Sequence, residues 1–138
     1  EVICSSRTYS KVEELVNDIN EKFAPVAEAV DIQDEKTMKE KVAESDVIMN
    51  NTGLGMPVSI DKTPIPKEYL NSRQLCFDAT YNPAKTKFLK EAEEVGCKIM
   101  NGLGMSLYQG AAQIELWSGK EAPIEAMRKE LLDIISGK

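Results

Sequence analysis

The feature that most constrains the fold of this chain is the alternation of short apolar runs with longer segments of helical periodicity. The apolar runs are strand-like and cover residues 2–4, 26–32, 46–50, 75–79 and 98–100. The helical segments begin near residues 10, 34, 86, 105 and 123, and the first carries an apolar stripe that includes Leu15 and Phe23. Strands joined by helical crossovers form parallel sheets. The sequence therefore predicts an α/β fold, with a mostly parallel sheet and helices on both of its faces.

Composition excludes several classes of site. The 138 residues contain no histidine, so the chain cannot build a Ser-His-Asp or Cys-His nucleophilic site or a His-ligated metal centre. The 17 Lys and Arg against 23 Asp and Glu give a net charge of −6, which argues against general binding to nucleic acid. No apolar stretch approaches the ~20 residues of a membrane span, so no membrane association is expected.

The three cysteines are widely spaced and form no Cys-x-x-Cys pair. Cys4, Cys76 and Cys97 each lie in or beside an apolar segment. This pattern predicts neither a disulfide framework nor a metal site, and it favours a reduced, cytoplasmic setting. We expect each cysteine to be a small buried apolar side chain rather than a reactive thiol.

Polar residues follow the predicted strands, and in parallel sheets ligands bind at the carboxyl ends of strands. The first strand is followed by 5–8 (Ser-Ser-Arg-Thr), with Lys11 one helical turn further on. At the end of the second strand of a dinucleotide-binding fold, an Arg accommodates the 2′-phosphate of NADP. The guanidinium group of Arg7 suits a phosphate. An exposed Arg at a helix start is the simpler alternative.

Three further loops have the same placement. They are 50–57, which contains two glycines, 78–83, which contains Tyr81 before Asn-Pro, and 101–105, which leads into a helix that carries Gln109. Glycines at a strand end permit close approach of backbone to a ligand. The alternatives are ordinary turns and, for Gln109, a hydrogen bond in helix packing. The Gly-x-Gly-x-x-Gly turn of dinucleotide-binding folds is not found. If residues 2–4 form the second strand, that turn is expected upstream of Glu1; otherwise it never existed.

Taken together, these loops resemble the motifs of the shikimate dehydrogenase family, in the same order and over nearly the whole chain. The family's Asn-Arg-Thr-x-x-Arg corresponds to 6–11 (Ser-Arg-Thr-Tyr-Ser-Lys), and its Asn-Ala-Thr-x-x-Gly-Met corresponds to 50–56 (Asn-Asn-Thr-Gly-Leu-Gly-Met). Its Asp-x-x-Tyr-Asn-Pro-x-x-Thr is residues 78–86, and its Gly-Leu-x-Met-x-x-x-Gln-Gly-Ala is residues 102–111. The resemblance implies a Rossmann-like NADP-binding domain that is incomplete at its N-terminal end, because the substrate domain and the Gly-rich turn are not matched.

The resemblance also implies roles for individual residues. NADP would be the cofactor, bound by Ser6, Arg7, Thr8, Lys11, Asn51, Thr52, Gly53, Met56, Ala79, Gly102 and Met105. Tyr81 and Gln109 would reach the substrate. The family's catalytic Lys and Asp belong to its substrate domain, so no catalytic residue is assigned in this chain. Ser6 and Lys11 stand where the family has Asn and Arg. NADP remains the expected cofactor despite these two differences.

The implied function is the cofactor-binding part of an NADP-dependent shikimate dehydrogenase, an oxidoreductase that interconverts 3-dehydroshikimate and shikimate in chorismate and aromatic amino acid biosynthesis. Residues 1–103 are expected to form the truncated NADP-binding domain, and residues 104–138 to form helices that pack on it and towards the substrate domain. We expect this chain alone to be inactive, and a homo-oligomer could form through an exposed sheet edge. Alternatives are a quinate/shikimate dehydrogenase and a non-enzymatic nucleotide-binding or oligomerisation module.

Overall fold

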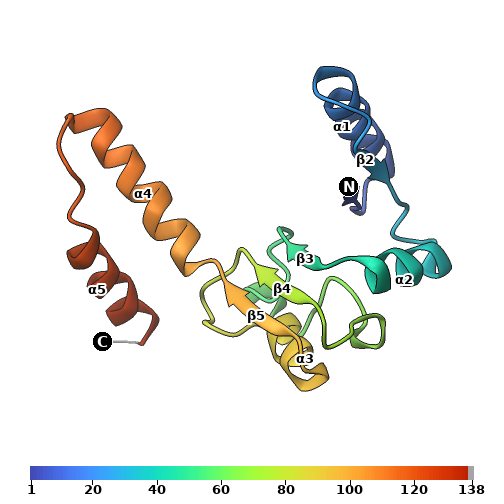
Figure 1. Cartoon of the computed structure of the whole chain (residues 1–138). Helices are drawn as coiled ribbons and strands as arrows, with labels where there is room; N and C mark the ends of the chain where they lie inside the picture. Colours follow the sequence, from blue (N-terminus) through green and yellow to red (C-terminus); the bar gives the residue numbers. More distant parts are fainter. Residues whose placement is uncertain (137–138) are drawn as a thin grey trace. The chain divides into compact units, whose positions relative to one another are not determined.

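The computed structural model describes residues 1–136 and divides the chain into two compact units, Glu1–Ser45 and Asp46–Lys138. Figure 1 shows the helices and strands of both units. Each unit is described by itself below.

The first unit contains two parallel strands and two helices. Strand β1 (Val2–Cys4) pairs with β2 (Ala27–Ala29), and helix α1 (Tyr9–Lys22) connects them. The side chain of Asn20 ties the end of α1 to β2, because its Nδ2 donates to the carbonyl of Ala27 and its Oδ1 accepts from the amides of Val26 and Ala27, each at 2.9 Å.

Helix α2 (Glu35–Glu44) follows β2 and begins where the sequence predicts. Asp34 is its N-cap, and the carboxylate accepts from the amide of Thr37 at 3.1 Å and from the Thr37 hydroxyl at 2.6 Å. These hydrogen bonds lower the pKa of Asp34 below its ordinary value. Met38 and Val42 form the buried face of the helix, as predicted.

The apolar stripe predicted for the first helix is only partly buried. Val12 and Val16 are buried, whereas Leu15 is 52% exposed and Phe23, which lies just past the end of α1, is 82% exposed. The predicted apolar stripe is therefore not covered at Leu15 and Phe23. A two-stranded sheet is too narrow to cover a stripe that extends over three turns.

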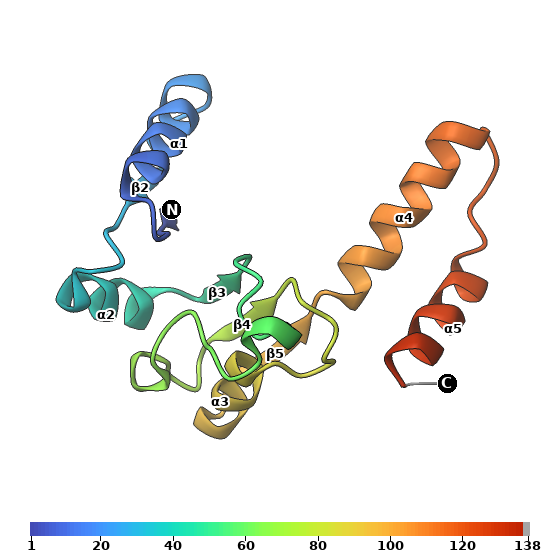
Figure 2. The same ribbon diagram turned by 180° about the vertical axis from the view of Figure 1, so that it is seen from behind.

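The second unit is built on a three-stranded parallel sheet in the order β3-β4-β5. The strands are β3 (Val47–Asn50), β4 (Leu75–Asp78) and β5 (Lys98–Asn101). The long connection between β3 and β4 holds two short 3-10 helices, η1 (Pro57–Ser59) and η2 (Lys67–Tyr69). Helix α3 (Lys87–Val95) connects β4 to β5 and packs against one face of the sheet (Figures 1 and 2). The opposite face carries exposed apolar side chains of Val47, Met49 and Met100.

Helix α3 has both of the boundaries that its sequence indicates. The Thr86 hydroxyl caps its N-terminus by accepting from the amide of Leu89, and Gly96 ends it with φ +94°. Phe88, Leu89 and Ala92 are the buried residues of the helix, and they pack onto the sheet with Cys76 of β4. Nearly complete burial of the aromatic and leucine side chains supplies much of the apolar core of this unit.

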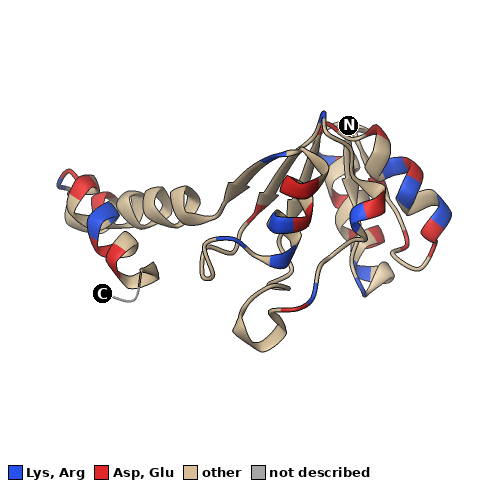
Figure 3. Ribbon diagram, turned by 90° about the horizontal axis from the view of Figure 1, so that it is seen from below, with Lys and Arg blue, Asp and Glu red and all other residues tan. Residues whose placement is uncertain are grey.

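The second unit ends in a helical hairpin of α4 (Leu103–Ser118) and α5 (Ile124–Ile135). The two helices approach closely at Gly110, where an added Cβ would lie 3.2 Å from the Met127 side chain. Figure 3 shows that α4 is almost free of charge, and its one charged residue is Glu115. Leu116 and Trp117 are 81% and 78% exposed. The surface of α4 is therefore nearly uncharged and includes exposed apolar side chains.

All described strand pairs are parallel and are joined by helices or long connections, which confirms the α/β class predicted from the sequence. The strands form two sheets, of two and three strands. Within residues 1–136, no helix is both long and apolar enough to cross a membrane.

The cysteines give a first test of this packing. Burial raises the pKa of the Cys76 thiol to about 12, and the neighbouring Cys97 adds to the rise. At pH 8 the Cys76 thiol is therefore almost entirely protonated and a poor nucleophile. We expect a thiol reagent to modify half-buried Cys4 in the folded chain and to reach all three cysteines in denaturant. Modification of Cys76 as fast as Cys4, followed by mass spectrometry of the peptides, would contradict this packing.

Candidate functional site

The carboxyl ends of the three strands of the second unit lie at one level of the sheet. Asn50 of β3 is the register partner of Asp78 of β4, which in turn is the partner of Asn101 of β5. Each of these polar residues ends its strand and begins one of the loops predicted to bind ligand. The register therefore brings the loops 50–57, 78–83 and 101–105 to the same edge of the sheet.

The carboxylate of Asp78 is the centre of a buried hydrogen-bond network at this edge. Asp78 is fully buried and accepts from the Asn50 amide at 3.0 Å, from the Thr86 hydroxyl at 2.7 Å and from the backbone amide of Thr80 at 2.9 Å. Asn50 and Thr86 are each only 1% exposed. The network joins the end of β3, the end of β4 and the N-terminus of α3.

Asn50 extends this network into the glycine-bearing loop. Its Oδ1 accepts from the amide of Thr52 at 3.1 Å and from the Thr52 hydroxyl at 2.7 Å, while its Nδ2 also donates to the carbonyl of Leu54 at 3.2 Å. The Thr52 hydroxyl in turn accepts from the amide of Leu54 at 3.2 Å. The loop is thus folded around one buried side chain.

The glycines of this loop are required by its geometry. Gly53 and Gly55 have φ of +71° and +95°, a region that side-chain-bearing residues rarely adopt. A Cβ on Gly55 would also lie 2.8 Å from Cβ of Thr86. Asn51, Thr52 and Met56, which the resemblance assigns to the cofactor, are exposed around this turn, and Gly53 is half-buried between them.

Backbone hydrogen bonds join all three loops. The amide of Ala79 donates to the carbonyl of Asn50 at 3.0 Å, and the amide of Gly102 donates to the carbonyl of Thr80 at 3.2 Å. A Cβ on Gly102 would lie 1.8 Å from the carbonyl oxygen of Ala79. Ala79 and Gly102, both assigned to the cofactor, are therefore in direct contact, next to the Asn50 loop.

The remaining predicted residues of the second unit are Tyr81, Met105 and Gln109, and their side chains are half-buried or exposed. Tyr81 is half-buried in the loop after β4, just before the cis peptide bond between Asn82 and Pro83. Met105 is exposed in the first turn of α4, and Gln109 is exposed one turn further along that helix. Tyr108, which precedes Gln109 in the sequence, accepts a hydrogen bond at its hydroxyl from Arg128 of α5 at 3.4 Å.

The predicted residues of the first unit lie in the turn between β1 and α1. The Ser6 hydroxyl accepts from the amide of Thr8 at 3.3 Å, so it shapes the turn itself. Arg7, Thr8 and Lys11 are exposed. Thr8 is the N-cap of α1 but makes no side-chain cap bond, and the first turn of the helix holds no acidic residue. This leaves a helix N-terminus next to two cations without a competing carboxylate in that turn.

One buried hydroxyl of this turn has no partner. The Oγ of Ser5 is inaccessible to solvent and is the only such side-chain atom among residues 1–136 that lacks a hydrogen bond. A buried polar group without a partner costs about 1–3 kcal/mol. It lies directly before the residues that the resemblance assigns to the 2′-phosphate.

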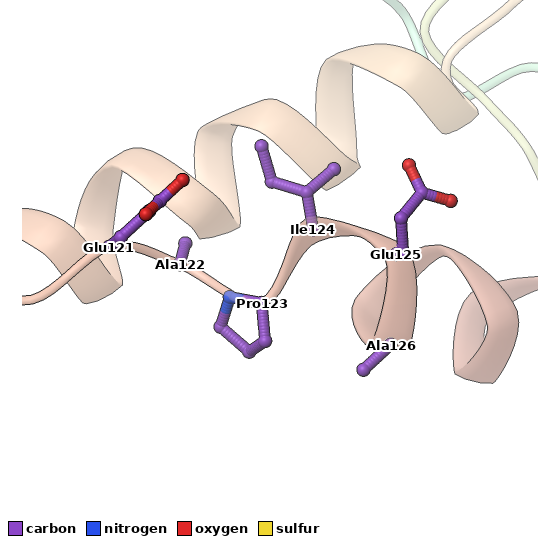
Figure 4. Close-up of a pocket in the computed structure, with 6 residues that line it drawn as sticks. All are labelled: Glu121, Ala122, Pro123, Ile124, Glu125 and Ala126. Carbon is purple, nitrogen blue, oxygen red and sulfur yellow. The ribbon is translucent and has the colours of Figure 1, made fainter.

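Two open depressions occur on the surface, and neither is lined by residues of the loops 50–57, 78–83 or 101–105. Figure 4 shows the one at the start of α5, lined by residues 121–126, in which Ile124 is directed towards α4 whereas Pro123 and Ala126 point away. It contains none of the predicted site residues. A second depression on α1 includes Lys11 together with Glu14, Leu15 and Asp18. Among residues 1–136, no group of three or more Cys, Asp or Glu side chains could hold a metal ion.

Sequence reasoning missed the three residues that organise the edge, namely Asn50, Asp78 and Thr86. The signal that could have found them is their position. Asn50 and Asp78 are the polar last residues of otherwise apolar strands, where a buried polar side chain needs partners. The sequence marks Thr86 as a helix start and as the end of the motif 78–86, but its hydroxyl bond to Asp78 was not predicted.

Comparison with known proteins gives a consistent family. The sequence profile of the shikimate 5′-dehydrogenase C-terminal domain matches residues 102–132. The shikimate dehydrogenase (NADP(+)) of Listeria monocytogenes is 39% identical over 125 residues, which are 90% of this chain and 43% of the relative. Curated relatives are matched over less than half of their length, 32% in one from Moorella thermoacetica.

Solved structures agree with the sequence matches. A crystal structure of shikimate 5-dehydrogenase from Listeria monocytogenes in complex with shikimate and NAD is 35% identical, with a TM-score of 0.84 over 94% of this chain and 47% of that one. A quinate dehydrogenase from Corynebacterium glutamicum in complex with NAD is 25% identical, with a TM-score of 0.86 over 96% of this chain and 46% of that one. By sequence and by fold, the chain belongs to the shikimate dehydrogenase family.

Proposed function

We propose that this chain is the cofactor-binding part of an NADP-dependent shikimate dehydrogenase, an oxidoreductase that interconverts 3-dehydroshikimate and shikimate. The observation that carries the proposal is the alignment of Asn50, Asp78 and Asn101, which places three family motifs at one edge of a parallel sheet. This edge is where ligands bind in such sheets. The names of the relatives supply the substrate and the cofactor.

The residues of the first unit fit the phosphate-bearing end of NADP. Arg7 and Lys11 are exposed cations beside the N-terminus of α1, whose first turn holds no acidic residue. A helix N-terminus and a guanidinium group both favour a phosphate. Thr8 offers a hydroxyl that makes no cap bond, whereas Ser6 acts through the turn it stabilises. No acidic residue occupies the position that would select the 2′-hydroxyl of NAD.

The residues of the second unit fit the nicotinamide end. The positive φ values of Gly53 and Gly55 keep the loop open to close backbone approach, with the Thr52, Asn51 and Met56 side chains at its surface. Ala79 and Gly102 would offer backbone to the nicotinamide, and Met105 lies one turn into α4. When bound, NADP supplies the hydride-transfer chemistry. Tyr81 and Gln109 would orient the substrate.

We propose that residues 104–138 contact the substrate domain through the C-terminal hairpin. The support for this contact is the apolar surface of α4, where Leu116 and Trp117 are exposed on a helix with a single charge. The free edges of the short sheets offer a second association surface, and a homo-oligomer through them remains our hypothesis. The three free cysteines are in keeping with a cytoplasmic location.

Quinate/shikimate dehydrogenase is the second candidate function. The resemblance in fold to the Corynebacterium quinate dehydrogenase favours it. The two candidates are separated by comparing turnover of quinate with that of shikimate, and NAD with NADP, in the presence of an added N-terminal half. A preference for quinate and NAD would favour the second.

The proposed function is tested by titrating the purified chain with NADP and by assaying NADPH formation from shikimate. We expect weak binding of NADP and no turnover, because no residue of this chain is assigned as a proton carrier. Adding the separately purified N-terminal half of the Listeria relative should produce turnover. Trp117 is the only tryptophan and is exposed, so its emission should shift to shorter wavelength as α4 is covered.

The control for this assay is Trp117→Phe, which removes the fluorescence signal of this chain and identifies any tryptophan of the added half. Failure of the chain to bind NADP at any concentration would refute the role in cofactor binding. Turnover by the chain alone would refute the assignment of proton transfer to the other half.

A further inference from the structure

We infer that Asp78 is a positioning residue that sets the shape of the loop Asn51–Met56 through Asn50 without touching the ligand. Asp78 is fully buried beneath this loop and its three donors come from three different segments. The inference rests on the proposed function for its ligand, because the loop is where the nicotinamide end would bind. The claim that Asp78 sets the shape of the loop does not depend on which ligand binds there.

The orientation of the Asn50 side chain is what Asp78 controls. An Asn side chain can be turned over, which exchanges its oxygen and its nitrogen. The carboxylate of Asp78 can only accept, so Nδ2 of Asn50 must face it. This leaves Oδ1 of Asn50 to accept from the amide and hydroxyl of Thr52. In the turned-over side chain, two oxygens would face each other and the Thr52 amide would face a donor.

Thr86 couples the same carboxylate to the helix that supports the loop. Its hydroxyl donates to Asp78 at 2.7 Å and accepts from the amide of Leu89, so the Asp78 carboxylate and the N-cap of α3 share one group. Gly55 of the loop lies against the Thr86 side chain. The loop is therefore held from two sides by groups that Asp78 orients.

The variant Asp78→Asn tests this inference with almost no change of shape. Whichever way the new side chain turns, its NH2 group faces a donor, either the Thr80 amide or the pair of Asn50 Nδ2 and the Thr86 hydroxyl, so one side of the network is lost. We expect hydrogen exchange at the amides of Thr52 and Leu54 to become about tenfold faster or more, relative to amides in the core of α3. The matched control is Gln74→Ala, since Gln74 is equally buried and lies next to β4 at its other end.

The two variants separate positioning from general stability. A residue that acts only on stability raises exchange at the loop and at α3 in the same proportion, as we expect for Gln74→Ala. The same uniform rise for Asp78→Asn would overturn the inference. If Asp78→Asn does not fold, Thr86→Val is compared with Thr86→Ser, which keeps the hydroxyl. Equal loop exchange in that pair would also overturn it.

Ligand binding distinguishes this inference from the proposed function. NADP contains both a nicotinamide end and a phosphate-bearing end. The compound 2′,5′-ADP contains only the phosphate-bearing end, which Arg7 would bind. Asp78→Asn should weaken NADP about tenfold and leave 2′,5′-ADP unchanged. An equal loss for both ligands would contradict the role of Asp78 at the nicotinamide end. If the unaltered chain binds neither ligand, the proposed function fails, and hydrogen exchange alone still decides the positioning role.

Discussion

Replacing Gly102 by Ala should destabilise the second unit by about 3 kcal/mol or more, because the new methyl group has no space. Its Cβ would lie 1.8 Å from the carbonyl oxygen of Ala79 and 2.4 Å from the carbonyl carbon. These are backbone atoms of the neighbouring loop, so no rotamer change relieves the clash. The backbone of Ala79 must move, and NADP binding should fall together with stability. Denaturant unfolding followed by circular dichroism measures the first effect.

Gly104 provides the matched control for Gly102. It lies two residues further on, in the first turn of α4, has no positive φ, and an added Cβ meets nothing within 4 Å. Gly104→Ala should leave stability unchanged or raise it by about 0.5 kcal/mol, since alanine favours the helix. The two substitutions make the same chemical change with opposite expected signs. Equal effects would show that the contact between Ala79 and Gly102 is not what requires the glycine.

Replacing Arg7 by Ala should weaken NADP binding about 10- to 100-fold, the range expected for loss of charge-assisted hydrogen bonds to a phosphate. Binding of NAD should change less than about threefold, because NAD carries a hydroxyl where NADP carries that phosphate. Arg7 is exposed in the turn before α1, so its removal should leave the fold intact. Calorimetric titration with each cofactor measures the difference.

Lys22 is the appropriate control for the charge of Arg7. It is in the same unit, at the opposite end of α1, and pairs with Asp18 on the helix surface. Lys22→Ala removes the same formal charge but should not change the preference between the two cofactors. An equal loss of NADP and NAD in the Arg7 variant would show that Arg7 does not read the phosphate.

The secondary structure of this chain was largely predictable because its signals are local. Asp34, Thr86 and Gly96 mark helix ends through bonds or dihedral angles that involve only a few neighbouring residues. The apolar runs between such signals could be identified as strands, and parallel pairing follows from the helices that separate them.

Burial was predicted less well because it depends on a partner that periodicity does not identify. Leu15 belongs to the same stripe as Val12 and Val16 yet is half exposed, and Ile134 of α5 is 64% exposed although it continues an apolar face. An amphipathic pattern indicates that a face is apolar, but it cannot say which surface covers that face.

The candidate site was predicted in its loops but not in its support. Its loops could be identified because four of them carry residues that resemble the motifs of one family in the same order. The roles of Asn50 and Asp78 could not, because a hydrogen bond between residues 28 positions apart depends on strand register. Neither residue is unusual by itself, and only the pairing of β3 with β4 brings them together.

The common level of Asn50, Asp78 and Asn101 also determines where this chain tolerates insertions and deletions. Side chains of a strand alternate between two faces, so one residue inserted into β4 would put the apolar Phe77 at the level of the carboxylate. All three candidate loops would lose their common support at once. A residue added between η1 and η2 lies outside the loop 50–57 and alters no register. Length can therefore vary between η1 and η2, but not in the strands or in the loop 50–57.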